Sequence, residues 1–172
     1  MKTFAVLVGV AVALTLQTTL SGMLIGRTLA VNLVVVAVVY AALAFGAVTG
    51  ALAGTIGGLA QDALAGGIVG IGGLSKTLIG FVVGLLGAQF IMSGVIARFL
   101  MFVAATVVHA VVFEGLSALA DGRAFALRWS AVGVQAAVNA TIGVMIFWVV
   151  ERSPEMLARR RARRAAFSKR RF

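Results

Sequence analysis

Four ionisable side chains lie in otherwise apolar parts of this 172-residue chain, and their chemistry needs an explanation first. Asp62 and Lys76 flank a glycine-rich segment, and His109 and Glu114 lie in a later apolar run. A charged group inside a membrane is costly, so by default it has a function or a partner. For Asp62 and Lys76 we weigh three hypotheses: a structural ion pair that clips the segment between them, a contact with a partner protein, and proton or ion transport.

The segment that contains Lys76 approaches a phosphate-binding pattern. Its sequence Gly70-Ile71-Gly72-Gly73-Leu74-Ser75-Lys76-Thr77 follows G-x-x-x-x-G-K-T, except that Ser75 replaces the second glycine. The backbone at that position has to approach phosphate closely, and no strand of a soluble domain precedes it, so we do not expect nucleotide binding. Ser75 beside Lys76 also suggests a serine–lysine hydrolase, but no further acid–base group accompanies the pair.

His109 and Glu114 do not obviously share a helical face, because five residues turn an α-helix by about 140° from its starting direction. We expect His109 to be a buried hydrogen-bond donor between helices rather than a proton relay. The same interpretation covers the amides Gln17, Asn32, Gln89, Gln135 and Asn139. The chain has no Cys and one His, which excludes thiolate and multi-histidine metal centres. We therefore expect no catalytic residue, cofactor or metal, and a protein that is not an enzyme.

The composition of the chain indicates which kind of secondary-structure element holds these residues. Hydrophobic residues make up 62% of the chain, and the mean hydropathy is +1.11. A membrane-spanning helix needs about 20 apolar residues, so the chain has room for about six spans. The net charge is +10, but residues 152–172 hold nine of the fifteen Lys and Arg and one of the five acids. We expect a six-span domain over residues 1–151, a basic tail over 152–172, and no nucleic-acid partner.

The uncharged runs between charges define the spans. The first lies between Lys2 and Arg27, and we expect it to be retained rather than cleaved as a signal peptide. The stretch from Thr28 to Gln61 is long enough for two spans, with a turn between Phe45 and Gly50. The remaining three are expected at Thr77–Ser93, Phe99–Leu119 and Trp129–Val150. The fold class is thus an all-α polytopic membrane helix bundle.

The distribution of Lys and Arg predicts the orientation. With both termini cytoplasmic, eleven basic residues lie inside and four outside, as the positive-inside rule requires. We therefore expect a multi-pass membrane protein with both termini on the cytoplasmic side. Trp129 and Trp148, 19 residues apart, suit the two membrane interfaces, although packing within the bundle is an alternative.

The tail begins with a helix-start signal. Ser153, Pro154 and Glu155 supply a capping hydroxyl, a first-turn proline and a first-turn acid, so we expect a second, short helix there. Basic side chains of the tail would then lie along anionic lipid headgroups; the alternative is a solvated, disordered tail. The residues of this candidate membrane surface are Arg159, Arg160, Arg161, Arg163, Arg164, Lys169, Arg170 and Arg171.

Glycines are concentrated in the centre of the chain, where 13 of the 21 fall between Gly46 and Gly87. Small residues at four-residue spacing let two helix backbones approach closely in lipid. The helix-packing positions are Gly46, Gly50, Gly54 and Gly58, with Gly80 and Gly84 on the next span; Asp62, Gly66 and Gly70 continue the first series. Because this spacing drifts by about 40° per step, we expect only neighbouring members to act together. We expect Ala65–Gly73 to be a loop or broken segment.

These features together resemble the rod-shape-determining membrane protein family MreD. The resemblance covers nearly the whole chain and is densest at Val31-Asn32-Leu33 through Tyr40, at Gly54-Thr55-Ile56-Gly57-Gly58-Leu59-Ala60-Gln61-Asp62, and in the glycine run to Lys76-Thr77. Gly46, Gly50, Gly70, Gly73 and Gly80 belong to the same pattern. One departure is that the family often has proline just before the second span, where this chain has Val31-Asn32.

The resemblance implies a non-enzymatic scaffold of the bacterial cell-elongation complex, involved in cell shape and peptidoglycan synthesis. Such proteins bind the single-span protein MreC directly and, through it, MreB, the glycosyltransferase RodA and its transpeptidase. A homo-oligomer is left open. The competing class is the substrate-binding membrane subunit of an energy-coupling-factor vitamin transporter, which would need an outward pocket with polar and aromatic groups. A channel would need rings of charges or exposed carbonyls.

Overall fold

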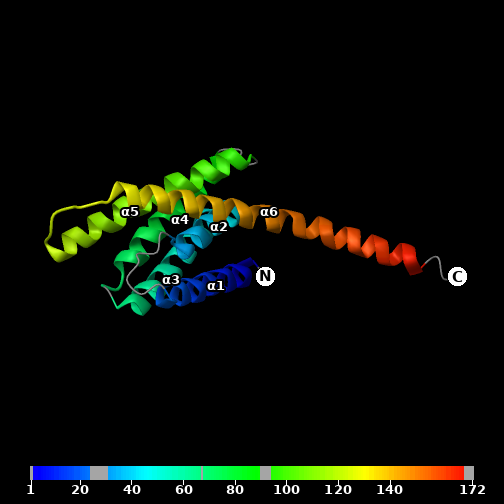
Figure 1. Cartoon of the computed structure of the whole chain (residues 1–172), viewed down its shortest axis with the longest axis horizontal. Helices are drawn as coiled ribbons and strands as arrows, with labels where there is room; N and C mark the ends of the chain where they lie inside the picture. The colour runs from blue at the N-terminus through cyan, green and yellow to red at the C-terminus, as the bar shows by residue number, and fades with distance from the viewer. Residues whose placement is uncertain (1, 24–30, 67, 90–93, 169–172) are drawn as a thin grey trace.

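The computed structural model describes residues 2–23, 31–66, 68–89 and 94–168, of which residues 2, 3, 5, 21–23 and 153–168 are described by their backbone alone. Within these ranges the chain contains helices and no strand, which confirms the all-helical prediction. The helices are α1 (Lys2–Met23), α2 (Leu33–Phe45), α3 (Ala47–Ala65), α4 (Ile71–Gln89), α5 (Val95–Asp121) and α6 (Trp129–Ser168) (Figure 1).

Three of these helices are long and apolar enough to cross a membrane: α4, α5 and the part of α6 from Trp129 to Arg152. Shorter apolar stretches occupy Val6–Leu20 and Leu33–Phe45. The start of α1 and the end of α6 lie at the same end of the bundle, and the loop between α5 and α6 lies at the opposite end (Figure 1). We call these the terminal end and the loop end.

Helix α2 forms the centre of the bundle and contacts all five other helices. Its thirteen residues are nearly all apolar, and Val34, Val38 and Val39 are completely buried. One core cluster joins α2 to α4, α5 and α6 around Phe102, and a second joins it to α1 and α3. At about 1.5 Å per residue, α2 is about 20 Å long and therefore shorter than a ~30 Å hydrocarbon core.

The turn between α2 and α3 consists of Gly46 alone, which confirms its expected place between Phe45 and Gly50. Gly46 has a φ of +93°, a backbone conformation that other residues rarely adopt. Its N–H donates to the Ala42 carbonyl at 2.9 Å, and its own carbonyl accepts from the Gly50 N–H at 3.0 Å. Close contacts of Gly50 with Ala42 and of Gly57 with Val34 show that the two helices then run antiparallel.

The glycines of α3 and α4 face each other in an antiparallel row. Gly50 lies against Gly80, Gly54 against Lys76, and Gly58 against Gly72, in each case with a backbone carbonyl where a Cβ would stand. Thr55 and Thr77 add a hydroxyl hydrogen bond of 2.7 Å across the same interface. The predicted close packing is therefore present for Gly50, Gly54, Gly58, Gly80 and Gly84, but it is wrong for Gly46, which is the turn residue and where a Cβ would meet nothing within 4 Å. The row of contacts between α3 and α4 is also longer than expected. Residues four positions apart form a row that is inclined to the helix axis, so a helix that crosses at an angle can follow this row for several steps.

Two predicted boundaries differ from the structure around this interface. Helix α4 begins at Ile71 rather than Thr77, so Gly72 and Gly73 are helical instead of part of a loop. The turn itself contains Gly66, with φ +69°, and Gly70, with φ +116°. Helix α5 is also longer than the expected Phe99–Leu119. The part of the fourth span expected at 90–93 lies outside the described residues.

Helix α6 continues without interruption from Trp129 to Ser168, so the expected separate helix after Ser153 is wrong. Pro154 therefore lies inside this helix, where its ring removes one backbone hydrogen bond, rather than at the first turn of a new one. Figure 1 shows the second half of α6 projecting beyond the other helices at the terminal end.

Candidate functional site

The Asp62 carboxylate caps the N-terminus of α4. Its Oδ2 atom accepts hydrogen bonds from the backbone N–H groups of Gly70 at 2.9 Å, Gly72 at 2.9 Å and Gly73 at 3.2 Å. The first N–H groups of a helix have no partner within it, and the helix dipole favours a negative charge there. Asp62 is 8% exposed. A buried carboxylate thus satisfies three N–H groups that would otherwise lack partners.

Glycine at position 72 makes this approach geometrically possible. A Cβ on Gly72 would overlap Oδ1 of Asp62, so any other residue there would push the carboxylate away. These three N–H groups belong to the segment that resembles a phosphate-binding loop. In this fold they donate to the chain's own Asp62 carboxylate.

Asp62 and Lys76 do not form the salt bridge that the first hypothesis required. The salt bridges among the described residues join Arg98 to Glu151, and Arg123 to both Glu114 and Asp121. The segment between Asp62 and Lys76 is clipped, but by hydrogen bonds from the carboxylate to the backbone. The sequence pattern could not reveal this, because it does not say that α4 starts five residues before Lys76.

Lys76 is only 2% exposed and lies one turn into α4. Its Nζ atom donates to the Gly72 carbonyl at a long distance of 3.5 Å and lies 5.8 Å from the centre of the Phe113 ring. An ammonium group has three donors. The Lys76 ammonium group therefore has donors that its hydrogen bond to Gly72 does not use.

His109 is buried with 5% exposure, and its ring stacks on Phe113 with the ring centres 5.9 Å apart. Its Nε2 atom is buried and has no hydrogen-bond partner, and neither has Oε1 of Gln61. The expectation that His109 uses its ring to bond a neighbouring helix is therefore wrong for this nitrogen. Buried polar atoms without a partner are uncommon and call for an explanation.

These groups line one polar cavity of about 290 Å³ between α3, α4, α5 and α6. The lining includes both His109 and Glu114, although their spacing suggested different faces of the helix. We call this volume the polar cavity. Its lining residues are Asn32, Gln61, Asp62, Ala65, Lys76, His109, Ala110, Phe113, Glu114, Leu127 and Gln135.

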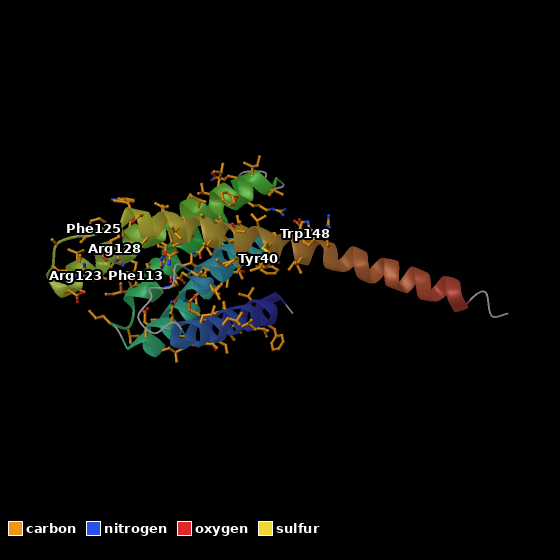
Figure 2. All side chains as sticks on the ribbon, in the orientation of Figure 1. Tyr40, Phe113, Arg123, Phe125, Arg128 and Trp148 are labelled. Atoms are coloured by element: carbon orange, nitrogen blue, oxygen red, sulfur yellow. The ribbon has the colours of Figure 1, made fainter. Side chains whose placement is uncertain are left out.

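Sequence analysis did not predict that Gln61, Gln135 and Asn32 contribute to one site. The sequence does contain a signal that could have found them. Each of the three lies near the end of its helix that is at the loop end of the bundle, so all three lie at a similar depth. Figure 2 shows Phe113 at this end, together with Arg123, Phe125 and Arg128.

Amide side chains behind the cavity fix the helices in register, as the sequence suggested for them. Asn32 caps α2 by accepting from the Val35 N–H at 3.2 Å, and its own N–H donates to Asn139 Oδ1 at 3.0 Å. Asn139, completely buried, also donates to Thr106 at 3.3 Å. Gln17 accepts from the Leu33 N–H and donates to the Val31 carbonyl. Asn32 thus caps the start of the second helix.

The outer rim of the cavity carries a small charge network. Arg123 donates to both oxygens of Glu114, at 2.5 and 3.1 Å, and to Asp121 at 3.3 Å. The Ala126 N–H also donates to Glu114, which ties the loop after α5 to that helix. The hydrogen bonds to Glu114 and then Asp121 raise the pKa of Arg123 above its already high usual value. Glu114 therefore has partners of its own.

A second, apolar groove lies between α1, α2 and α6 and has a volume of about 500 Å³. Small residues form part of its floor, among them Gly9, Ala13, Ala37 and Ala41, and Tyr40 lies toward its α6 side (Figure 2). We call it the apolar groove. Helices α1 and α6 flank it without packing against each other.

At the terminal end, Arg98 pairs with Glu151 at 2.5 Å and lies 4.6 Å from the Phe147 ring. Trp148 is 54% exposed and contacts Arg152, and Trp129 at the other end of the apolar part of α6 is 63% exposed. The alternative that both indoles pack inside the bundle is therefore wrong. The basic side chains from Arg159 onward lie outside the side chains that the structure describes, so their contact with lipid stays a prediction.

Among the described residues, no three His, Cys, Asp or Glu side chains gather in a way that could hold a metal ion. The fold and its cavity define an all-helical protein with helices of membrane-spanning length and a polar cavity at the loop end. No family model, curated protein or solved structure matches the chain.

Proposed function

We propose that the chain is a non-enzymatic membrane scaffold of the bacterial cell-elongation complex. In this proposal it binds the membrane-spanning helix of MreC and, through MreC, joins MreB, RodA and its transpeptidase, and so helps to regulate cell shape and peptidoglycan synthesis. The MreD-like residues support it, because the densest part of the resemblance forms one rigid unit: the α3–α4 pair with its glycine row and the Asp62 cap.

The observation that carries the proposal is the apolar groove. Its lining is apolar apart from Tyr40, and it extends along α1 from Val6 to Leu16, about 15 Å at 1.5 Å per residue. Helices associate in lipid mainly by close packing, and small residues let a partner backbone approach. A single apolar helix is the kind of partner that fits this surface.

The arrangement of charges supports an orientation with both termini cytoplasmic. The terminal end carries Arg98, which pairs with Glu151 of α6, and the basic stretch of α6, whereas Arg123 and Arg128 lie at the loop end (Figure 2). Basic residues are enriched on the cytoplasmic side of membrane proteins. The groove then faces the lipid of the inner membrane, and the polar cavity faces outward.

Copurification tests the groove. A Cβ on Gly9 meets nothing within 4 Å, so Gly9→Leu fills the groove without disturbing the fold, and Gly133→Leu adds the same side chain at an equally open position outside it. We expect Gly9→Leu to reduce the MreC that copurifies about tenfold, equivalent to about 1.4 kcal/mol. Gly133→Leu should copurify MreC at the wild-type level. Equal recovery of MreC with both variants would contradict this docking site.

A second candidate is the substrate-binding membrane subunit of an energy-coupling-factor vitamin transporter. The polar cavity favours it, because it gathers polar groups and the Phe113 ring at one end of the bundle. Its volume lies just below the usual range of small-molecule sites, about 300–1,000 Å³. A vitamin bound stoichiometrically to the purified protein would support this candidate over the scaffold.

A further inference from the structure

The polar cavity contains hydrogen-bonding atoms that the protein itself leaves without partners. Nε2 of His109 and Oε1 of Gln61 are both buried and unpaired, and both residues line the cavity. His109 is 5% exposed, so bulk solvent does not reach its ring freely. A ligand with both a hydrogen-bond acceptor and a donor would satisfy these two atoms.

The charged side chains around the cavity differ in how many hydrogen-bond and salt-bridge partners they have. Asp62 has three backbone N–H donors, and Glu114 has Arg123 and the Ala126 N–H. Lys76 has one long hydrogen bond to a neutral carbonyl and takes part in none of the salt bridges among the described residues, although it is only 2% exposed. A buried charge normally requires an opposite charge and further hydrogen bonds. An anion beside Lys76 would supply that opposite charge within the cavity.

We propose that the polar cavity binds a small monocarboxylate, with the ligand carboxylate on the Lys76 ammonium group and a ligand hydroxyl or amine on Gln61. His109 Nε2 completes the set of polar contacts. The walls contributed by Ala65, Ala110, Phe113 and Leu127 accommodate a short apolar part. With about 30 Å³ per water-sized group, 290 Å³ admits a ligand of about ten non-hydrogen atoms.

The same geometry argues against a phosphate or a dicarboxylate. A phosphate is usually held by several backbone N–H groups at a helix N-terminus, and here Asp62 already occupies those of Gly70, Gly72 and Gly73. A second negative charge would lie near Asp62 and Glu114 with no second free cation among the lining residues. One carboxylate matches one lysine.

Binding of matched probes to the full purified chain tests the proposal. The probes are acetate, lactate and phenylacetate, each compared with its uncharged amide by calorimetry and by thermal unfolding in detergent. We expect at least one carboxylate to bind and to raise the unfolding temperature, and its amide to bind at least about tenfold more weakly. Lys76→Met should abolish this preference, and Arg98→Met, which removes a basic residue at the terminal end, should keep it.

Two results would overturn the proposal. One is that no carboxylate binds more tightly than its amide to the wild-type chain, a comparison that needs no variant. The other is that Lys76→Met folds and keeps the full preference for the carboxylate. The assay contains no MreC, so its outcome is independent of the proposed scaffold function.

Discussion

At Asp62 one carboxylate oxygen accepts hydrogen bonds from the backbone N–H groups of Gly70, Gly72 and Gly73, just before and within the first turn of α4. Hydrogen bonds to a charged group are stronger than neutral ones, and these lie in a buried site with little competition from water. Asp62, whose charge would be costly to bury in lipid without partners, therefore holds the glycine-rich turn in a defined structure. Lys76, which sequence analysis paired with it, is left for another role.

Charge exchange distinguishes this cap from an ion pair. Asp62→Ala should lower the free energy of unfolding by roughly 2–3 kcal/mol, because it removes a helix cap and leaves buried N–H groups unsatisfied. Asp62→Lys should be at least as harmful. The combined variant Asp62→Lys with Lys76→Asp should not recover stability, since Lys cannot accept hydrogen bonds from the backbone. The measurement is thermal unfolding of the purified variants, and recovery in the combined variant would favour the ion pair.

At the level of elements, the α3–α4 pair is held by contact between backbones. Gly54 and Gly58 place no side chain between the helices, so the carbonyls of Lys76 and Gly72 lie directly against them. Neither partner can move without displacing a whole helix, since the atoms in contact belong to the backbone. The pair should therefore behave as one rigid unit within the bundle.

A single methyl group tests this packing. Gly54→Ala should lower the free energy of unfolding by about 1–3 kcal/mol or more, because the added Cβ overlaps the Lys76 carbonyl. Gly133→Ala is the matched control, since its Cβ meets nothing within 4 Å and alanine favours a helix over glycine. Unfolding temperatures of the two variants provide the comparison. Equal effects would show that α3 and α4 do not pack as closely as described.

The sequence predicted those elements that depend on local chemistry. The turn at Gly46, the close packing of Gly50, Gly54 and Gly58, and the structural role of Asn32 all follow from residue type and spacing. The start of α4 was missed, because its first turn is stabilised by Asp62 from another helix. Local glycine content alone favours a loop there.

The polar cavity could not be predicted for the same kind of reason. Its polar groups come from Asn32, Gln61, Lys76, His109 and Gln135, which lie far apart in the chain, and only the antiparallel packing of the helices places them at one depth. Lys76 and His109 can be singled out from the sequence as ionisable groups in apolar runs, but neither their spacing nor that of the amides shows that they share one cavity. Their meeting, with His109 Nε2 unpaired, depends on tertiary structure.

At the scale of the whole molecule, the bundle presents two distinct surfaces at different depths. The apolar groove lies along α1, α2 and α6, and the polar cavity lies at the loop end. Helix α6 is about 60 Å long at 1.5 Å per residue, so about half of it extends beyond a ~30 Å hydrocarbon core (Figure 1). The proposed partner helix and the proposed ligand would therefore occupy separate surfaces of the bundle.

Cell shape after a clean deletion tests the scaffold most directly. In a rod-shaped host of this gene, the deletion should produce round cells, and wild-type protein or Gly133→Leu should restore rods. Gly9→Leu, expressed at the same level, should leave the cells round, because it blocks the apolar groove. Cells that stay rod-shaped after the deletion, with a vitamin bound stoichiometrically to the purified protein, would contradict the scaffold and favour the transporter subunit.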